Sequence, residues 1–81
     1  MSAVPDAERD LLQAVLEALS LPFEAAFYDQ RLNDRAGFAR VVIRDALAEA
    51  AERPDAFTWN ADWLRRKLRE EEARHSAGEQ R

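Results

Sequence analysis

The spacing of proline is the feature that most constrains the fold of this chain. Its 81 residues contain three prolines, Pro5, Pro22 and Pro54. A proline fits the first turn of a helix, but it pushes the residue before it out of helical geometry and breaks a helix interior. The stretches after each proline carry apolar residues at helical spacing. The sequence therefore predicts an all-α, three-helix domain.

The first helix is predicted over residues 6–19. Acidic side chains in its first turn, Asp6 and Glu8, complement the positive end of the helix dipole. Apolar residues at helical spacing form one stripe, which we expect to face the core. The stripe consists of Leu11, Leu12, Val15, Leu16 and Leu19.

A long middle helix is predicted over residues 28–52, because small and apolar residues recur there with the 3-4 spacing of a coiled coil. This alanine-rich seam consists of Leu32, Ala36, Ala39, Ile43, Ala46 and Ala50. Such a helix would measure about 37 Å, whereas a globular chain of this size has a radius of gyration of about 12 Å. Either it breaks near Asn33-Asp34 or Gly37, or a second copy covers the overhang. We favour an unbroken helix and a homodimer formed through the seam.

The last helix is predicted to begin around Asn60, a residue type that caps helix N-termini well. Trp59 would then pack against Leu64 as a hydrophobic staple. No apolar stripe continues beyond Leu68, so we expect the helix to fray there. A single domain is predicted over 1–74, with a disordered tail over 75–81.

A short aromatic stretch precedes the middle helix, and residues 22–28 could form an extra helical turn. Its side chains Phe23, Phe27 and Tyr28 have no evident burial partner in the sequence. Exposed aromatic side chains are enriched at protein interfaces. We therefore predict that these three residues contact a partner protein.

The hydrophobic composition predicts a thin core. Alanine accounts for 16 residues, while Leu, Ile, Val and Phe together account for only 18. Small domains with little apolar area often oligomerise or dock onto a partner. The composition therefore favours association as well.

Charge and cysteine content limit the classes of partner and compartment. Residues 1–64 carry 12 acids and 6 bases, a balance that argues against a nucleic-acid footprint over the whole domain. The chain has no cysteine, which fits a reducing compartment. The N-terminal segment carries acidic residues where a signal peptide needs basic ones. No run of apolar residues approaches the ~20 residues of a membrane span. We predict a cytoplasmic protein without a membrane partner.

Residues able to carry catalysis or hold a metal are few and scattered. Ser2 and Ser20 have no histidine nearby in the sequence, and Ser76 follows His75 directly but lies in the predicted tail. Two glycines, Gly37 and Gly78, cannot build a phosphate-binding loop. The only histidine, His75, lies in the predicted tail. Asp45 and Glu49 could share a hard cation, but such pairs are ordinary on a solvated helix face. We predict neither enzymatic activity nor a cofactor.

One basic segment allows a nucleic-acid interpretation. Four cations follow Trp63: Arg65, Arg66, Lys67 and Arg69. Together with the indole they could bind phosphates and stack a base. Alternatively, Glu70 and Glu71 neutralise cations one turn earlier, and the segment is a solvated helix face. The second interpretation is favoured, and the first stays open.

The order of elements and the segment Thr58-Trp-Asn-Ala-Asp-Trp-Leu-Arg65 resemble small uncharacterised all-helical proteins of actinobacterial phages and integrative elements. The resemblance covers residues 11–69. It implies an accessory protein of a mobile element, and it carries no activity or site residue over to this chain.

The sequence thus predicts a non-enzymatic helical module that self-associates and binds another protein. The alternative is a nucleic-acid-binding accessory factor that uses the basic last helix. A third hypothesis, in which the acidic body mimics nucleic acid, fits poorly because arginines are scattered among the acids.

Overall fold

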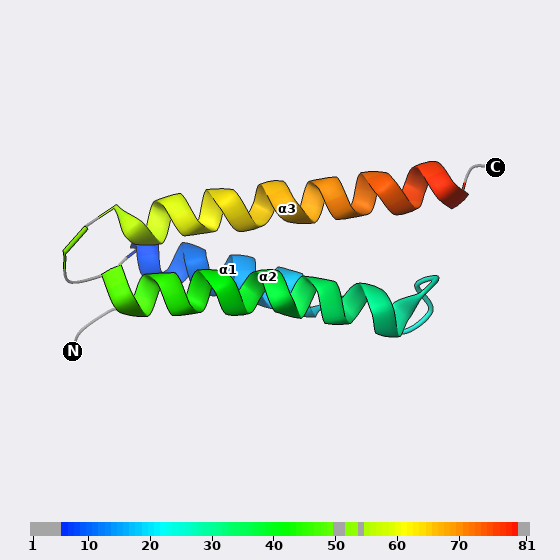
Figure 1. Ribbon diagram of the computed structural model, residues 1–81, viewed down its shortest axis with the longest axis horizontal. Helices are drawn as coiled ribbons and strands as arrows, with labels where there is room; N and C mark the ends of the chain where they lie inside the picture. Colours follow the sequence, from blue (N-terminus) through cyan, green and yellow to red (C-terminus); the bar gives the residue numbers. More distant parts are fainter. Residues whose placement is uncertain (1–5, 50–51, 54, 80–81) are drawn as a thin grey trace.

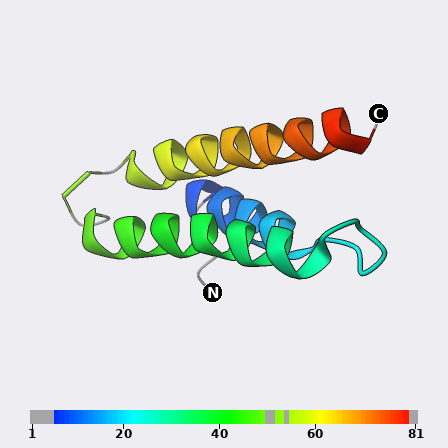
Figure 2. The same ribbon diagram turned by 45° about the vertical axis from the view of Figure 1, so that its right-hand side comes forward.

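The computed structural model describes residues 6–49, 52–53 and 55–79, which form three helices. They are α1 (Asp6–Leu19), α2 (Tyr28–Glu49) and α3 (Ala56–Glu79). Helices α1 and α3 run in the same direction and α2 runs in the opposite one, with α1 against both longer helices (Figures 1 and 2). The predicted all-α, three-helix fold with a long middle helix is confirmed.

The middle helix is unbroken, and the same chain covers its length. Helix α2 has 22 residues and α3 has 24, whereas α1 has only 14. The two long helices lie side by side in a molecule that measures 48 × 24 × 16 Å (Figure 1). A second copy is therefore not needed to cover the long middle helix, contrary to the prediction, because α3 is also long.

Alanine dominates the core. The buried cluster comprises Leu11, Ala14, Ala18, Ala39, Val42, Ala46, Ala61, Leu64 and Leu68. Five of these nine are alanines, and small side chains let helix axes approach closely. The predicted stripe on α1 is therefore largely wrong: Leu11 is buried and Val15 is half-buried, but the other three leucines are exposed.

Helix α3 begins at Ala56, one turn earlier than predicted. The backbone N–H of Trp59 donates to the Asp55 carbonyl over 3.0 Å, which makes Asp55 the start of the helical hydrogen bonding. Asn60 lies inside the helix, where its Nδ2 donates to Asp45 Oδ2 over 2.7 Å and to the Ala56 carbonyl over 2.8 Å. Trp59 is exposed, so the predicted staple is absent.

Helix α3 also continues well past Leu68, to Glu79. The predicted fraying, and the disordered tail as far as residue 79, are therefore wrong; residues 80–81 lie outside the described part. The inward face continues after Leu68 with Glu71 and His75, which keep the same 3-4 spacing but are polar. The spacing of apolar residues alone does not reveal this continuation, because its inward residues are polar.

Glu71 is fully buried between two arginines of α2. Arg31 donates from Nε to Glu71 Oε2 over 2.5 Å and from Nη2 to Oε1 over 3.1 Å. Arg35 Nη1 reaches Oε1 at 3.4 Å, and His75 Nε2 lies 3.3 Å from Oε2. This buried cluster joins α2 to α3 in the part of the bundle that lies beyond the last turn of α1.

Arg35 ties the same cluster to α1. Its Nε donates to the Ala18 carbonyl and its Nη2 to the Glu17 carbonyl, both over 2.8 Å. The last carbonyls of a helix have no partner within it, and a cation there complements the negative end of the dipole. Arg35 therefore caps α1 with a side chain from α2.

The ionisation of Glu71 reflects these contacts. Burial by itself would raise the pKa of Glu71, but the hydrogen bond and charge of Arg31 act against it. The charges of Arg35 and His75 add to that effect, and the resulting pKa is lowered below its ordinary value of 4.5. Glu71 is thus held as a carboxylate.

We expect Glu71→Ala to destabilise the fold by about 3 kcal/mol or more, because it leaves two buried guanidinium groups without their carboxylate. The matched control is Glu72→Ala, since the Glu72 side chain is 62% exposed and reaches Arg35 only at 3.9 Å. The control should cost less than about 1 kcal/mol. Urea denaturation followed by far-ultraviolet circular dichroism measures both, and equal losses would contradict the role given to Glu71.

The lowered pKa of Glu71 also predicts a pH dependence. Its contribution to stability is complete above the unfolded-state pKa, about 4.5, and is lost as the pH falls through the folded-state pKa. The difference in unfolding free energy between the native chain and Glu71→Gln should therefore shrink below about pH 4.5. Other carboxylates are common to both proteins, so a difference that stays constant to pH 3 would contradict this assignment.

Candidate interaction surfaces

The structure divides the predicted alanine-rich seam between the core and the surface. Ala39 and Ala46 are buried in the core, and Leu32 and Ala36 are half-buried. Ile43 is exposed, and Ala50 lies outside the described residues. The seam as predicted cannot be a single self-association surface, because two of its residues already pack within their own subunit.

Exposed apolar side chains instead gather where α1 lies against α2. We call this the α1/α2 face, and it comprises Leu12, Leu16, Leu19, Ile43 and Leu47. On α1 the three leucines follow one another at intervals of four and three residues, so they share one side of the helix. Scattered exposed leucines are normal, but a contiguous apolar surface marks an interaction site.

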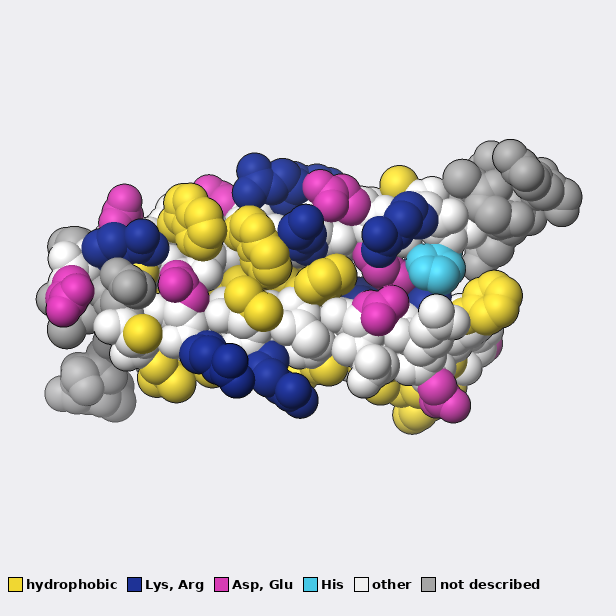
Figure 3. Space-filling view, in the orientation of Figure 1, with side chains coloured by type: hydrophobic (Ala, Val, Ile, Leu, Met, Phe, Trp, Pro, Cys, Tyr) yellow, Lys and Arg dark blue, Asp and Glu magenta, His cyan; other side chains and the backbone are white. Residues whose placement is uncertain are grey.

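A groove of about 490 Å³ runs along this face. It is lined by Leu19, Ala36, Ala39, Arg40, Ile43, Arg44 and Leu47. Its walls are mainly apolar, and its two charged residues, Arg40 and Arg44, are exposed. Figure 3 shows Lys or Arg side chains projecting from the α2 side of the molecule, with hydrophobic side chains emerging behind them.

The two groove arginines have no acidic partner in the part of the chain that the structure describes. Arg31 and Arg35 of the same helix form ion pairs with Glu71. In contrast, Arg40 and Arg44 form neither an ion pair nor a side-chain hydrogen bond with described residues. The groove on the α1/α2 face therefore has apolar walls and a cationic rim, although the protein has a net charge of −4.

The predicted partner-binding aromatics form a second exposed surface. Residues 23–27 are turns, with the Ala25 N–H donating to the Pro22 carbonyl over 3.0 Å, so the extra helical turn does not form. Phe23 is 84% exposed and Phe27 69% exposed, whereas Tyr28 is half-buried and its ring lies 5.2 Å from that of Phe23. We call the segment 23–29 the aromatic tip.

Phe27 adopts an unusual backbone conformation. Its φ is 57°, in the left-handed region that bulky residues rarely enter, while its carbonyl accepts the first hydrogen bond of α2 from Arg31 N–H over 2.9 Å. Its ring lies 6.2 Å from that of His75. The chain thus keeps an exposed phenylalanine at a position where glycine or asparagine would cost less.

The basic segment of α3 is largely engaged within the protein. Arg65 Nη1 contacts the Asp10 carboxylate at 2.9 Å, and its Nη2 lies 3.5 Å from Glu17. The hydrogen bond to Asp10 is the main cause of the raised pKa of Arg65, while partial burial acts against it. Lys67 lies 3.6 Å from Glu70 and 5.6 Å from the centre of the Trp63 ring.

The four predicted cations therefore do not act together. Arg65 holds α1 to α3, and Lys67 packs over Trp63 on another side of the helix. Arg66 and Arg69 are exposed and form no ion pair with described residues. Only these two are available for the predicted contact with nucleic acid.

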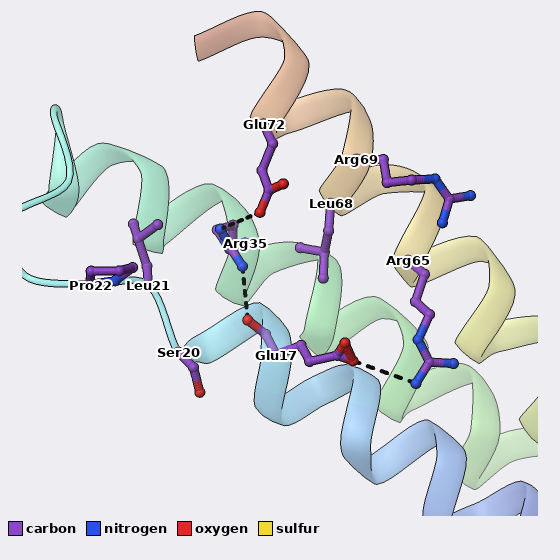
Figure 4. Close-up of a pocket in the computed structure, with 9 residues that line it drawn as sticks. All are labelled: Glu17, Ser20, Leu21, Pro22, Arg35, Arg65, Leu68, Arg69 and Glu72. Carbon is purple, nitrogen blue, oxygen red and sulfur yellow. Dashed lines mark hydrogen bonds and ion pairs between the residues drawn. The ribbon is translucent and has the colours of Figure 1, made fainter. Parts of the chain in front are cut away.

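A second pocket, of about 450 Å³, lies where α1 ends against α3 (Figure 4). Three arginines approach it, but Arg35 and Arg65 contact Glu17 and Glu72, as the dashed lines show. Only Arg69 lines it without such a contact. The charges of this pocket are mostly satisfied within the chain.

Within the described residues, no three His, Cys, Asp or Glu side chains are grouped so that they could hold a metal ion. In the same part of the chain, no helix is long and apolar enough to cross a membrane. Comparison with protein-family models, curated proteins and solved structures finds no match. The resemblance to phage and integrative-element proteins stays a prediction.

We expect Phe27→Asn to be more stable than Phe27→Ala by about 0.5–1 kcal/mol, because asparagine tolerates the left-handed conformation better than alanine does. Both variants lack the ring, so their difference isolates the backbone term. Chemical denaturation of the two variants side by side measures it. An alanine variant at least as stable as the asparagine variant would show that the backbone at 27 is not strained.

Proposed function

We propose that this protein is a non-enzymatic interaction module that self-associates through its α1/α2 face. The observation that carries the proposal is the exposure of five large apolar side chains on two adjoining helices, with exposed fractions from 41% for Ile43 to 81% for Leu47. Leu19, Ile43 and Leu47 line one groove, and Leu12 and Leu16 share the side of α1 on which Leu19 lies. The alanine seam predicted from the sequence contributes only part of the groove on this face, through Ala36, Ala39 and Ile43.

The expected association is weak. Covering the remaining exposed area of a leucine or isoleucine contributes on the order of 1 kcal/mol. Five such side chains give about 5 kcal/mol, near the lower end of the ~4–15 kcal/mol that association costs in lost freedom. A surface that buries such area on both partners contributes about 10 kcal/mol, which exceeds the lowest cost by about 6 kcal/mol and corresponds to a dissociation constant of roughly tens of micromolar or weaker.

Nucleic-acid binding by α3 is the alternative, and it is less favoured. Arg65 and Lys67 are committed to acids of the same chain. Arg66 and Arg69 alone would neutralise about two phosphates, too few for the strong salt-dependent binding of nucleic-acid proteins.

The cellular setting of the proposal comes from the sequence. A chain without cysteine fits a reducing compartment, so we place the module in the cytoplasm. The proposed role is that of an accessory protein which assembles with itself and holds another protein, in keeping with the resemblance to proteins of mobile elements.

We expect Leu47→Glu to weaken self-association at least ten-fold, because it places a charge on the α1/α2 face while removing little buried area. Size-exclusion chromatography with light scattering, from 5 to about 500 μM protein, measures the average mass against the 9.3 kDa of one chain.

The matched control is Val41→Glu, which changes an exposed apolar residue of the same helix outside the groove. It should associate as the native chain does. A native chain that stays monomeric over the whole range would overturn the proposal, and so would equal effects of the two substitutions.

A further inference from the structure

We infer that the groove on the α1/α2 face receives the aromatic tip of a second copy of this chain. The inference rests on the proposed self-association and specifies what fills the groove. Phe23 and Phe27 would enter the groove, and the acids of the tip would meet the arginines of its rim.

The tip is exposed, and the helix end that precedes it is anchored to the bundle. It projects at the end of the molecule where α1 connects to α2 (Figure 1), and Phe23 is the most exposed of the large apolar residues described. Leu21, two residues before the tip, is buried, and Arg35 binds the carbonyls of the preceding helix turn. A tip held on a fixed base loses little conformational entropy when it binds.

The groove offers a complementary shape. Ala36 and Ala39 have short side chains, so they leave room between the larger Leu19, Ile43 and Leu47. A convex pair of phenylalanines requires such a concave apolar site to become buried, because a flat surface would cover only one side of each ring.

The charges also match. The tip carries Glu24 and Asp29 and has no Lys or Arg between residues 20 and 30. Neither acid forms an ion pair with the described residues. The groove carries Arg40 and Arg44, which lack acidic partners as well. Tip and groove thus leave two acids and two bases unsatisfied within one subunit, and docking would pair them.

Pairing of two identical α1/α2 faces would satisfy these charges less well. A two-fold contact brings the same surface of both copies together, so four groove arginines would approach one another. On α1, Arg9 and Glu8 lie three and four residues before Leu12, so this helix adds no net charge to the contact. Contact between tip and groove avoids this repulsion.

A contact between tip and groove is head-to-tail. Each subunit uses its tip on one neighbour and its groove on another, so the native chain should form a closed ring or a growing chain of subunits. The average mass should then rise beyond that of a dimer as the concentration increases. Added salt should weaken the assembly, because the ion pairs at the groove rim are exposed.

The test mixes two variants that are each defective on one side. Phe23→Ser with Phe27→Asn removes the tip, and Leu47→Glu blocks the groove. Each variant alone should be monomeric, because the first has no intact tip and the second has no intact groove. Mixed in equal amounts, the intact groove of the first should bind the intact tip of the second, and light scattering should report a capped heterodimer of about twice 9.3 kDa.

The outcomes separate this inference from the proposed function. If the tip variant self-associates like the native chain while Leu47→Glu does not, the face is used but the tip is not, and the inference is overturned. A mixture that stays monomeric also overturns it. If the native chain does not associate, both ideas fail together.

Charge reversal provides a second measurement that keeps the apolar side chains. Arg40→Glu with Arg44→Glu, and separately Glu24→Arg with Asp29→Arg, should each weaken association at least ten-fold. In their equimolar mixture, the acidic tip of the first variant meets the native groove of the second, and the basic tip of the second meets the acidic groove of the first. Association should therefore recover in the mixture, as it should when one chain carries all four changes. Failure of the combined variant, with native circular dichroism, would refute the charge pairing.

Discussion

The carboxylate of Glu71 lies in the interior of the bundle with the guanidinium groups of Arg31 and Arg35 on it, and the arrangement of all three helices depends on this cluster. Glu71 comes from α3, and both arginines come from α2. Arg35 then reaches the last carbonyls of α1. Helix α1 has only 14 residues and ends at Leu19. Without the charged cluster, α2 and α3 would face each other beyond that point across an unfilled space. Charged side chains fill that space and satisfy one another.

The use of buried charge at this end has a consequence for the surface. Arg31 and Arg35 are occupied in the interior, so the exposed cations of α2 in its later half, Arg40 and Arg44, are the ones left to face outward. They flank a groove whose apolar walls come from α1 as well as α2. The aromatic tip follows directly from the helix end that Arg35 caps. The buried cluster therefore anchors the helix end that leads into the aromatic tip. The groove keeps Arg40 and Arg44 as its exposed charges.

Helix boundaries and core residues were predictable to different degrees. The start and end of α1, the start of α2 and the existence of a third helix follow from prolines, first-turn acids and apolar spacing. The inward face of α1 was not predictable from hydrophobicity, because Ala14 and Ala18 are buried while Leu12 and Leu16 are exposed. Close packing favours the smaller side chain wherever two neighbouring helices leave little room. Likewise, Asn60 resembles a cap in the sequence but serves as a buried link to Asp45.

By itself the sequence determined the number of helices, their order and the aromatic stretch between the first two, because these depend on local preferences of proline, alanine and first-turn acids. It also contained the signal for the extended α3, since Glu71 and His75 keep the inward spacing of Leu64 and Leu68. Only the tertiary structure decided which face of α1 is buried, which arginines pair with Glu71 and which stay exposed. Those outcomes depend on contacts between residues that are far apart in the chain, such as Arg31 with Glu71, 40 positions away. Local spacing cannot tell a charge that is buried with a partner from one that faces water.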